Sequence, residues 1–212
     1  MRQRRIHNRE KLIEEFGSCI VEDPASVKGR WSELFGNDRP VKLEIGSGKG
    51  AFITGICLRD KDINFIACEG AYNVYPRIPQ KAAALNVSNL LVLASYITDP
   101  SEFFEDSEIS GIYLNFSDPW KKKYSSRRLT YRDKIEGYRR ICKPGSALEF
   151  KTDNDELFSF TLDELAYLGL EPEVVEYDLY SSPYLAANIP TEYEEKFTKQ
   201  GVTIKYLRLI FT

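Results

Sequence analysis

The chain is poor in the residues from which many active sites are built. Its 212 residues include a single histidine, His7, and four cysteines that lie far apart without a CxxC pair. This scarcity argues against a metal site and for free thiols, as in a reducing cytoplasm. No apolar run approaches the length of a membrane span, and no apolar segment follows the basic N-terminus as in a secretory signal. We therefore expect a cytoplasmic protein with no metal and no membrane partner, and the sequence leaves a monomer and a homodimer equally open.

Basic residues are gathered in two segments of an acidic chain. The net charge is −3, yet residues 118–143 hold ten basic and three acidic residues and residues 1–11 hold five and one, so the remainder carries −14. A solvated charged face explains any single basic run. Two such runs on an acidic body favour a polyanionic partner, because phosphates can approach only where the basic residues cluster. We expect residues 1–11 to become ordered on that partner.

Short apolar runs alternate with helical patterns through the middle of the chain. Five strand–helix repeats predict a doubly wound α/β fold with right-handed crossovers. The expected strands are Val41–Ile45, Ile63–Cys68, Leu90–Leu93, Ile109–Phe116 and Ala147–Phe150, with the first two helices at Ala51–Leu58 and Pro79–Leu85. Capping residues predict further helix starts at Asp99, at Thr130, at Asp153 or Asn154, and at Thr191, where Glu194 completes a capping box.

The periodicity changes after Pro172. Val175, Tyr177 and Leu179 alternate with more polar residues, and Lys205–Phe211 repeats this two-residue period. We therefore expect an antiparallel pair to close a mostly parallel, seven-stranded sheet with an antiparallel C-terminal strand. Residues 1–35 are expected to form a basic arm and a lead-in helix, and residues 36–212 to form one catalytic domain.

A glycine-rich loop, LEIGSGKG at residues 43–50, lies where the first strand gives way to a helix. Gly46 and Gly48 allow a sharp turn and a close approach to a ligand, although a simple tight turn has the same pattern. Glu69, at the end of the second strand, can accept both hydroxyls of a ribose. The loop also fits the dinucleotide fingerprint, but Glu44 beside it disfavours a pyrophosphate and suits a cationic ligand. The loop therefore favours S-adenosylmethionine.

A single carboxylate, Asp118, stands at the start of the basic segment in NFSDPWKKKYSSRRLT. By itself the motif is typical of an Asp-Pro turn with a packed tryptophan. In a doubly wound sheet, however, the end of the fourth strand faces the glycine loop. Guanine N7 suits such a site, because it has a lone pair, no proton to remove and thus no need of a histidine base. Asp118 would stabilise the positive charge that methylation creates on the ring, while Lys122, Arg127 and Arg128 hold phosphates.

These segments resemble the bacterial tRNA (guanine-N7)-methyltransferase family. The resemblance runs from about Gly29 to the C-terminus and rests on WSELFG, LEIGSGKG, YLNFSDPW, RRLTY, FKTDN and TEYEEKF in this order. It implies a Rossmann-like class I methyltransferase fold and methylation of a guanine in the variable loop of tRNA. It also implies a contact of Asp118 with S-adenosylmethionine, in addition to the catalytic role inferred above. The other contacts that we predict are Glu44, Gly46, Gly48 and Glu69 for S-adenosylmethionine, Lys122, Asp153, Thr191, Glu192, Tyr193 and Glu194 for the tRNA substrate, and Lys121, Lys123, Arg127 and Arg128 for the tRNA backbone.

The sequence departs from the family pattern at three places. Lys121 and Ser125 replace a proline and a histidine that are usual in the DPW loop, and Tyr96 stands where an Asp or Asn usually lies near the adenine. The N-terminal arm lacks the family's usual KPWA-like stretch. None of these changes removes a residue that the chemistry requires.

Three alternative functions remain open at this point. A methyltransferase acting on an exocyclic amine of a base usually has two consecutive prolines before the aromatic residue, which DPW lacks. A non-catalytic RNA-binding protein would not need the intact set of Glu44, Glu69 and Asp118 with the glycines. A nicotinamide oxidoreductase explains neither basic segment. The sequence therefore favours a tRNA methyltransferase.

Overall fold

The computed structural model describes residues 9–212, and the predicted arm therefore lies largely outside the described residues. Eight strands form a single sheet in the order β1-β4-β3-β2-β5-β6-β8-β7. The strands are β1 (Ile20–Val21), β2 (Val41–Ile45), β3 (Asn64–Cys68), β4 (Leu90–Leu93), β5 (Ile109–Asn115), β6 (Cys142–Thr152), β7 (Val174–Glu176) and β8 (Lys205–Ile210). Only β8 runs antiparallel to its neighbours β6 and β7, so the mostly parallel sheet with an antiparallel C-terminal strand is confirmed.

The strand count differs from the seven that we expected. The additional strand, β1, pairs in parallel with β4 at the edge of the sheet. Two residues are too few for a periodic pattern, which is why the sequence does not reveal this strand. The segment before residue 36 therefore contributes an edge strand to the sheet.

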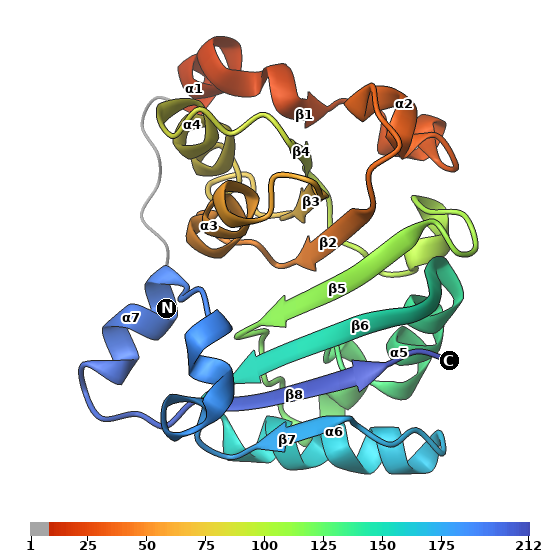
Figure 1. The fold of residues 1–212 in the computed structure, drawn as a ribbon, viewed down its shortest axis with the longest axis vertical. Coiled ribbons are helices and arrows are strands. Elements are labelled where there is room, and N and C mark those ends of the chain that lie inside the picture. The colour runs from red at the N-terminus through yellow and green to blue at the C-terminus, as the bar shows by residue number, and fades with distance from the viewer. Residues whose placement is uncertain (1–8) are drawn as a thin grey trace.

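Helices cover both faces of the sheet (Figure 1). They are α1 (Arg9–Phe16), α2 (Trp31–Phe35), α3 (Ala51–Arg59), α4 (Arg77–Ala84), α5 (Arg132–Ile141), α6 (Asp155–Tyr167) and α7 (Glu192–Thr198). Apolar residues of α3 and α4 pack with Phe65 and Ala67 of β3 in one core cluster. Those of α5 and α6 pack with Ile66 and Cys68 of the same strand in the other. Alternate residues of a central strand thus enter opposite cores, as the pleat requires.

Local signals predicted the starts of α3, α6 and α7 but not those of α4 and α5. The α4 helix begins at Arg77, two residues before the expected Pro79, because a proline is tolerated within the first turn of a helix. Asn154 caps α6 by accepting from the Leu157 amide, and Thr191 and Glu194 form the expected capping box of α7. Asp99 caps only a short 3-10 helix, Pro100–Glu102. Thr130 is not a cap: α5 begins one residue later, after Tyr131, and the buried Thr130 hydroxyl accepts a hydrogen bond from Thr161. Burial against α6 outweighs its local capping tendency.

The strand order reverses at β2. The chain moves outward from β2 through β3 and β4 on one side, then crosses over to β5 and β6 on the other. Ligands of doubly wound folds bind at the carboxyl ends of the strands at such a switch point. In Figure 1 the arrowheads of β5 and β6 point towards α7, so this C-terminal helix lies at the same edge. No helix in residues 9–212 has the length and apolar character that a membrane crossing requires.

Candidate active site

The glycine loop follows β2 at the switch point. The amides of Gly46 and Ser47 both donate to the carbonyl of Cys68, at 2.8 and 3.0 Å, and these bonds fix the loop to the end of β3. Gly46 and Gly48 have φ values of 82° and 56°, in the left-handed region that favours glycine. Apart from the adjacent residues of the chain, no described atom lies within 4 Å of the position that a Cβ would take at either residue. The loop therefore presents open backbone on the side that a ligand would approach.

Glu44 is buried beneath this loop with an incomplete set of partners. It is 1% exposed, and its Oε1 accepts a 2.8 Å hydrogen bond from the Asn115 side chain on β5. Its Oε2 has no hydrogen-bond partner among residues 9–212. Burial raises the pKa of Glu44 to about 7. A buried carboxylate oxygen without a donor is rare in folded proteins, and an ammonium or sulfonium group would satisfy it.

Glu69 connects the end of β3 to the glycine loop. Its two carboxylate oxygens accept from the amides of Gly48, at 3.0 Å, and Ala71, at 2.8 Å. Burial raises the pKa of Glu69, and the negative charge of Asp118 raises it further. Glu69 and Asp118 are therefore close enough to interact electrostatically, although 49 residues separate them in the chain.

The DPW loop places Asp118 beside the basic segment. Two residues of this loop, Phe116 and Trp120, have positive φ values of 53° and 20°, which are uncommon for residues with side chains. Asp118 lines a cavity of about 610 Å³ together with Pro119, Trp120, Lys121, Lys123, Tyr124, Asn154 and Glu156. The predicted acid and two of the predicted basic residues therefore share one cavity.

The predicted tRNA backbone residues fall into two groups. Lys121, Lys123 and Arg127 are exposed, as is Lys122, which opens the 3-10 helix Lys122–Arg127. Arg128 is instead 2% exposed, and its guanidinium donates to the Trp120 carbonyl and to Glu156. This guanidinium is occupied within the protein rather than offered to a phosphate. It holds the DPW loop in place.

α7 lies across the same edge of the sheet and contacts both halves of the site. Glu192 accepts from the Ala51 amide at the start of α3, at 3.3 Å, and pairs with Lys81 at 2.5 Å. The Tyr193 hydroxyl donates to Asp153 at 2.9 Å, and its ring lies 5.0 Å from that of Phe116. The predicted substrate residues on α7 thus lie between the glycine loop and the DPW loop.

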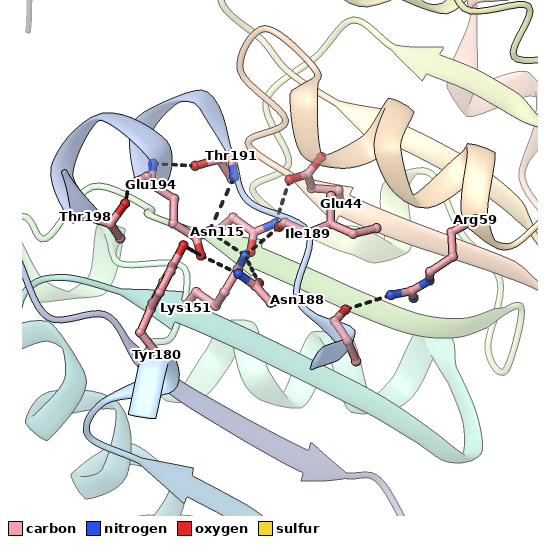
Figure 2. A network of polar contacts seen from close by, with 11 residues as sticks. Glu44, Arg59, Asn115, Lys151, Tyr180, Asn188, Ile189, Thr191, Glu194 and Thr198 are labelled. Atoms are coloured by element: carbon pink, nitrogen blue, oxygen red, sulfur yellow. Dashed lines mark hydrogen bonds and ion pairs between the residues drawn. The ribbon is translucent and has the colours of Figure 1, made fainter. Parts of the chain in front are cut away.

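A buried polar network anchors α7 at Glu194 (Figure 2). The ammonium of Lys151 on β6 donates to Glu194 at 2.7 Å, to the Asn188 side chain at 2.9 Å and to the Ile189 carbonyl at 3.0 Å. Glu194 also accepts from Asn188 at 2.7 Å and from Tyr180 at 3.2 Å. Burial lowers the pKa of Lys151, whereas the charge of Glu194 opposes this effect. Glu194 is 0% exposed, so in this arrangement it holds α7 rather than facing a base.

Known proteins resemble this chain along almost its whole length. A family model described as "Putative methyltransferase" matches residues 38–207. A tRNA (guanine-N(7)-)-methyltransferase of Lactococcus lactis subsp. cremoris is 41% identical over 212 residues, which cover 98% of each chain. One of Streptococcus pyogenes serotype M6 is 40% identical over 205 residues, or 96% of this chain and 97% of the relative. The chain belongs to the tRNA (guanine-N7)-methyltransferase family.

Solved methyltransferase structures share the fold of this family member at low sequence identity. The 16S rRNA methyltransferase KamB is 15% identical with a TM-score of 0.64, covering 87% of this chain and 94% of that one. An antibiotic-related methyltransferase is 18% identical with a TM-score of 0.61, covering 85% and 92%. These likenesses confirm the expected Rossmann-like class I fold.

Several important residues of this methyltransferase family member were not predicted from its sequence. Asn115 and Lys151 contact Glu44 and Glu194. They lie within the YLNFSDPW and FKTDN motifs, but neither motif indicates these partners. Tyr96 is 71% exposed, and its ring packs against Gly70, where an added Cβ would lie 2.4 Å from ring atoms. The Tyr96 ring therefore lies against Gly70, the residue that follows Glu69 in the chain.

Proposed function

We propose that the protein transfers the methyl group of S-adenosylmethionine to N7 of a guanine in the variable loop of tRNA. One observation carries this proposal: Glu44 is buried at the end of β2 with an unpartnered oxygen, Glu69 binds the glycine loop, and Asp118 lines a cavity with the exposed Lys121 and Lys123. The near-full-length similarity to tRNA (guanine-N(7)-)-methyltransferases supports it.

The residues present fit S-adenosylmethionine. The unpartnered Oε2 of Glu44 suits a cationic amino group, and the Glu69 carboxylate suits ribose hydroxyls. Gly46 and Gly48 leave open backbone between them. When bound, S-adenosylmethionine supplies an electrophilic methyl group on a positively charged sulfur.

The chain's own contribution to the reaction is positioning and electrostatics. In the transfer the N7–CH₃ bond forms from the guanine lone pair as the S–CH₃ bond breaks, so no proton moves. This agrees with the absence of histidine from residues 9–212. Approximation of this kind contributes on the order of 7–11 kcal/mol to catalysis. Asp118 stabilises the positive charge that develops on the guanine ring.

α7 and the basic segment hold the tRNA in this proposal. Lys121 and Lys123 line the cavity, and Lys122 and Arg127 are exposed in the same segment; all four contact phosphates. Asp153 and Tyr193, which are joined by a hydrogen bond, face the substrate, with Thr191 and Glu192 beside them. Glu194 positions this segment through Lys151.

The test is transfer of labelled methyl from S-adenosylmethionine to unmodified tRNA, mapped by borohydride–aniline cleavage, which breaks the chain at N7-methylguanine. We expect one cleavage in the variable loop. Methyl incorporation without cleavage would move the target to another atom, such as an exocyclic amine. Binding of tRNA without any transfer would support a non-catalytic RNA-binding protein.

A further inference from the structure

The DPW loop and the 3-10 helix that follows it carry an exposed cluster of two aromatic rings and one cation. Its members are Trp120, Tyr124 and Arg127. The two rings are 38% and 41% exposed and lie 6.4 Å apart in a T-shaped arrangement. The guanidinium of Arg127 lies 5.0 Å from the centroid of each ring. Trp120 and Tyr124 both line the cavity that contains Asp118.

The backbone of Trp120 is strained and is held by hydrogen bonds from Arg128. Its φ of 20° is strained for a residue with a side chain. The Trp120 carbonyl accepts two hydrogen bonds from the buried Arg128, at 3.0 Å from Nε and 2.6 Å from Nη2. Arg128 itself lies 4.4 Å from the centroid of the Phe160 ring. A strained φ and a buried cation therefore fix the backbone of Trp120, whose indole remains partly exposed.

Packing does not explain this indole. The other tryptophan, Trp31, is fully buried, stacks on Phe104 and donates to the Phe103 carbonyl. Trp120 makes no comparable contribution to either core cluster in residues 9–212. A strained, fixed and exposed residue of this kind is typical of a binding surface.

The chemistry of the cluster matches a nucleobase that is joined to a phosphate. Proteins that bind unstacked bases commonly use aromatic rings with cations beside them. Here Arg127 and Lys123, whose ammonium lies 4.8 Å from the centroid of Tyr124, provide the cations. An enzyme that modifies a base within a folded nucleic acid must also take that base out of its stack. The energy lost in unstacking is then partly regained on the protein.

We propose that Trp120 is the stacking surface for the guanine that receives the methyl group. The guanine lies on the face of the indole opposite Arg127, and Asp118 of the same loop faces the ring where positive charge develops. Tyr124, whose ring centroid also lies 5.0 Å from the Arg127 guanidinium, helps to hold Arg127. This inference rests on the proposed function and specifies how its substrate is bound.

The first test measures stacking without any reaction. In a Trp31→Phe protein, Trp120 is the only tryptophan, and unmodified tRNA is titrated in the absence of S-adenosylmethionine. We expect strong quenching of indole fluorescence, which is lost with a tRNA that is abasic at the methylated position but otherwise identical. Equal quenching by the two tRNAs would overturn the proposal. If Trp31→Phe does not fold, the difference in quenching between the wild type and Trp120→Phe provides the same signal.

The second test separates stacking from the proposed reaction. Stacking on an aromatic residue contributes about 1–3 kcal/mol per base, so Trp120→Ala should lower kcat/KM for tRNA by about 5- to 150-fold. Trp120→Phe, which keeps a ring, should recover most of this loss, and S-adenosylhomocysteine affinity should be unchanged in both. Tyr177→Ala removes an exposed ring that does not line the cavity and serves as the control.

These outcomes distinguish the two proposals. Methyl transfer by the wild type with no effect of Trp120→Ala would overturn the stacking role and leave the proposed function intact. Base-dependent quenching without any methyl transfer would overturn the proposed function and retain the stacking site.

Discussion

Replacing Glu44 with glutamine should change how the stability of the protein depends on pH. Burial raises the pKa of Glu44 to about 7 from 4.5. A carboxyl group with a raised folded pKa retains its proton in the folded protein at pH values where the unfolded chain has lost it. Its stabilising effect is therefore complete below pH 4.5 and is lost as the pH rises through 7. The free energy of unfolding should fall by about 3 kcal/mol over this interval, at about 1.4 kcal/mol per pH unit.

The assay is urea unfolding at pH values from 5 to 8. Glu44→Gln removes the titrating group and keeps the geometry of the acceptor for Asn115. The advantage of the variant over the wild type should grow by about 2.5 kcal/mol between pH 5 and pH 8. Glu33→Gln, at an exposed carboxylate on α2, should leave the pH dependence unchanged. Parallel curves for the wild type and Glu44→Gln would refute the argument that Glu44 is buried without a cation.

Ligand affinity provides an independent readout of the same carboxylate. We expect ionised Glu44 to accept a hydrogen bond from the amino group of S-adenosylhomocysteine. Glu44 is mostly ionised at pH 8 and mostly protonated at pH 6, so this ligand should bind the wild type roughly tenfold more tightly at pH 8. Isothermal titration calorimetry measures this change. The same pH dependence in Glu44→Gln would show that another group causes it.

Three further predictions concern the surroundings of the site. Lys151→Met leaves Glu194 charged and buried, and it should lower the free energy of unfolding by about 3–5 kcal/mol. The double variant Lys151→Met, Glu194→Leu should recover much of this loss. An equal loss in the single and the double variant, measured by urea unfolding, would contradict the pairing. Arg128→Ala removes both donors to the Trp120 carbonyl, and it should abolish most methyl transfer at a cost of about 1–3 kcal/mol in unfolding; unchanged transfer would rule out its role in the loop. Deleting residues 1–8, which carry three arginines, should weaken tRNA binding and reduce its salt dependence. Filter binding at several salt concentrations measures both effects. Unchanged binding would show that these residues do not contact tRNA.

Features that depend on neighbouring residues in the chain were predictable from the sequence. The β2 and β4 bounds agree with the expected ones, because short apolar runs that end at turn residues are typical of buried parallel strands. The capping box of Thr191 and Glu194 also follows from a local spacing. The location of Glu44, Glu69 and Asp118 at or just after the carboxyl ends of β2, β3 and β5 follows from the topology of a doubly wound sheet.

Partner choice between distant residues was not predictable in the same way. Glu194 and Arg128 look like surface charges in the sequence, yet both are buried and paired with groups that the fold brings to them. Lys151 lies within the FKTDN motif, but this motif does not indicate its three contacts, with Asn188, Ile189 and Glu194. The residue type of a lysine or arginine in a basic run does not indicate whether its side chain binds a phosphate or a carbonyl of its own chain.

The most direct test of the central claim is single-turnover methyl transfer to unmodified tRNA by the wild type and by Asp118→Asn, with the product mapped by borohydride–aniline cleavage. We expect cleavage at one guanine of the variable loop and a transfer rate that is about 100-fold lower in the variant, with tRNA affinity unchanged. An equal rate in Asp118→Asn would contradict the electrostatic role of this carboxylate, and a methylated product that resists cleavage would contradict N7 as the target.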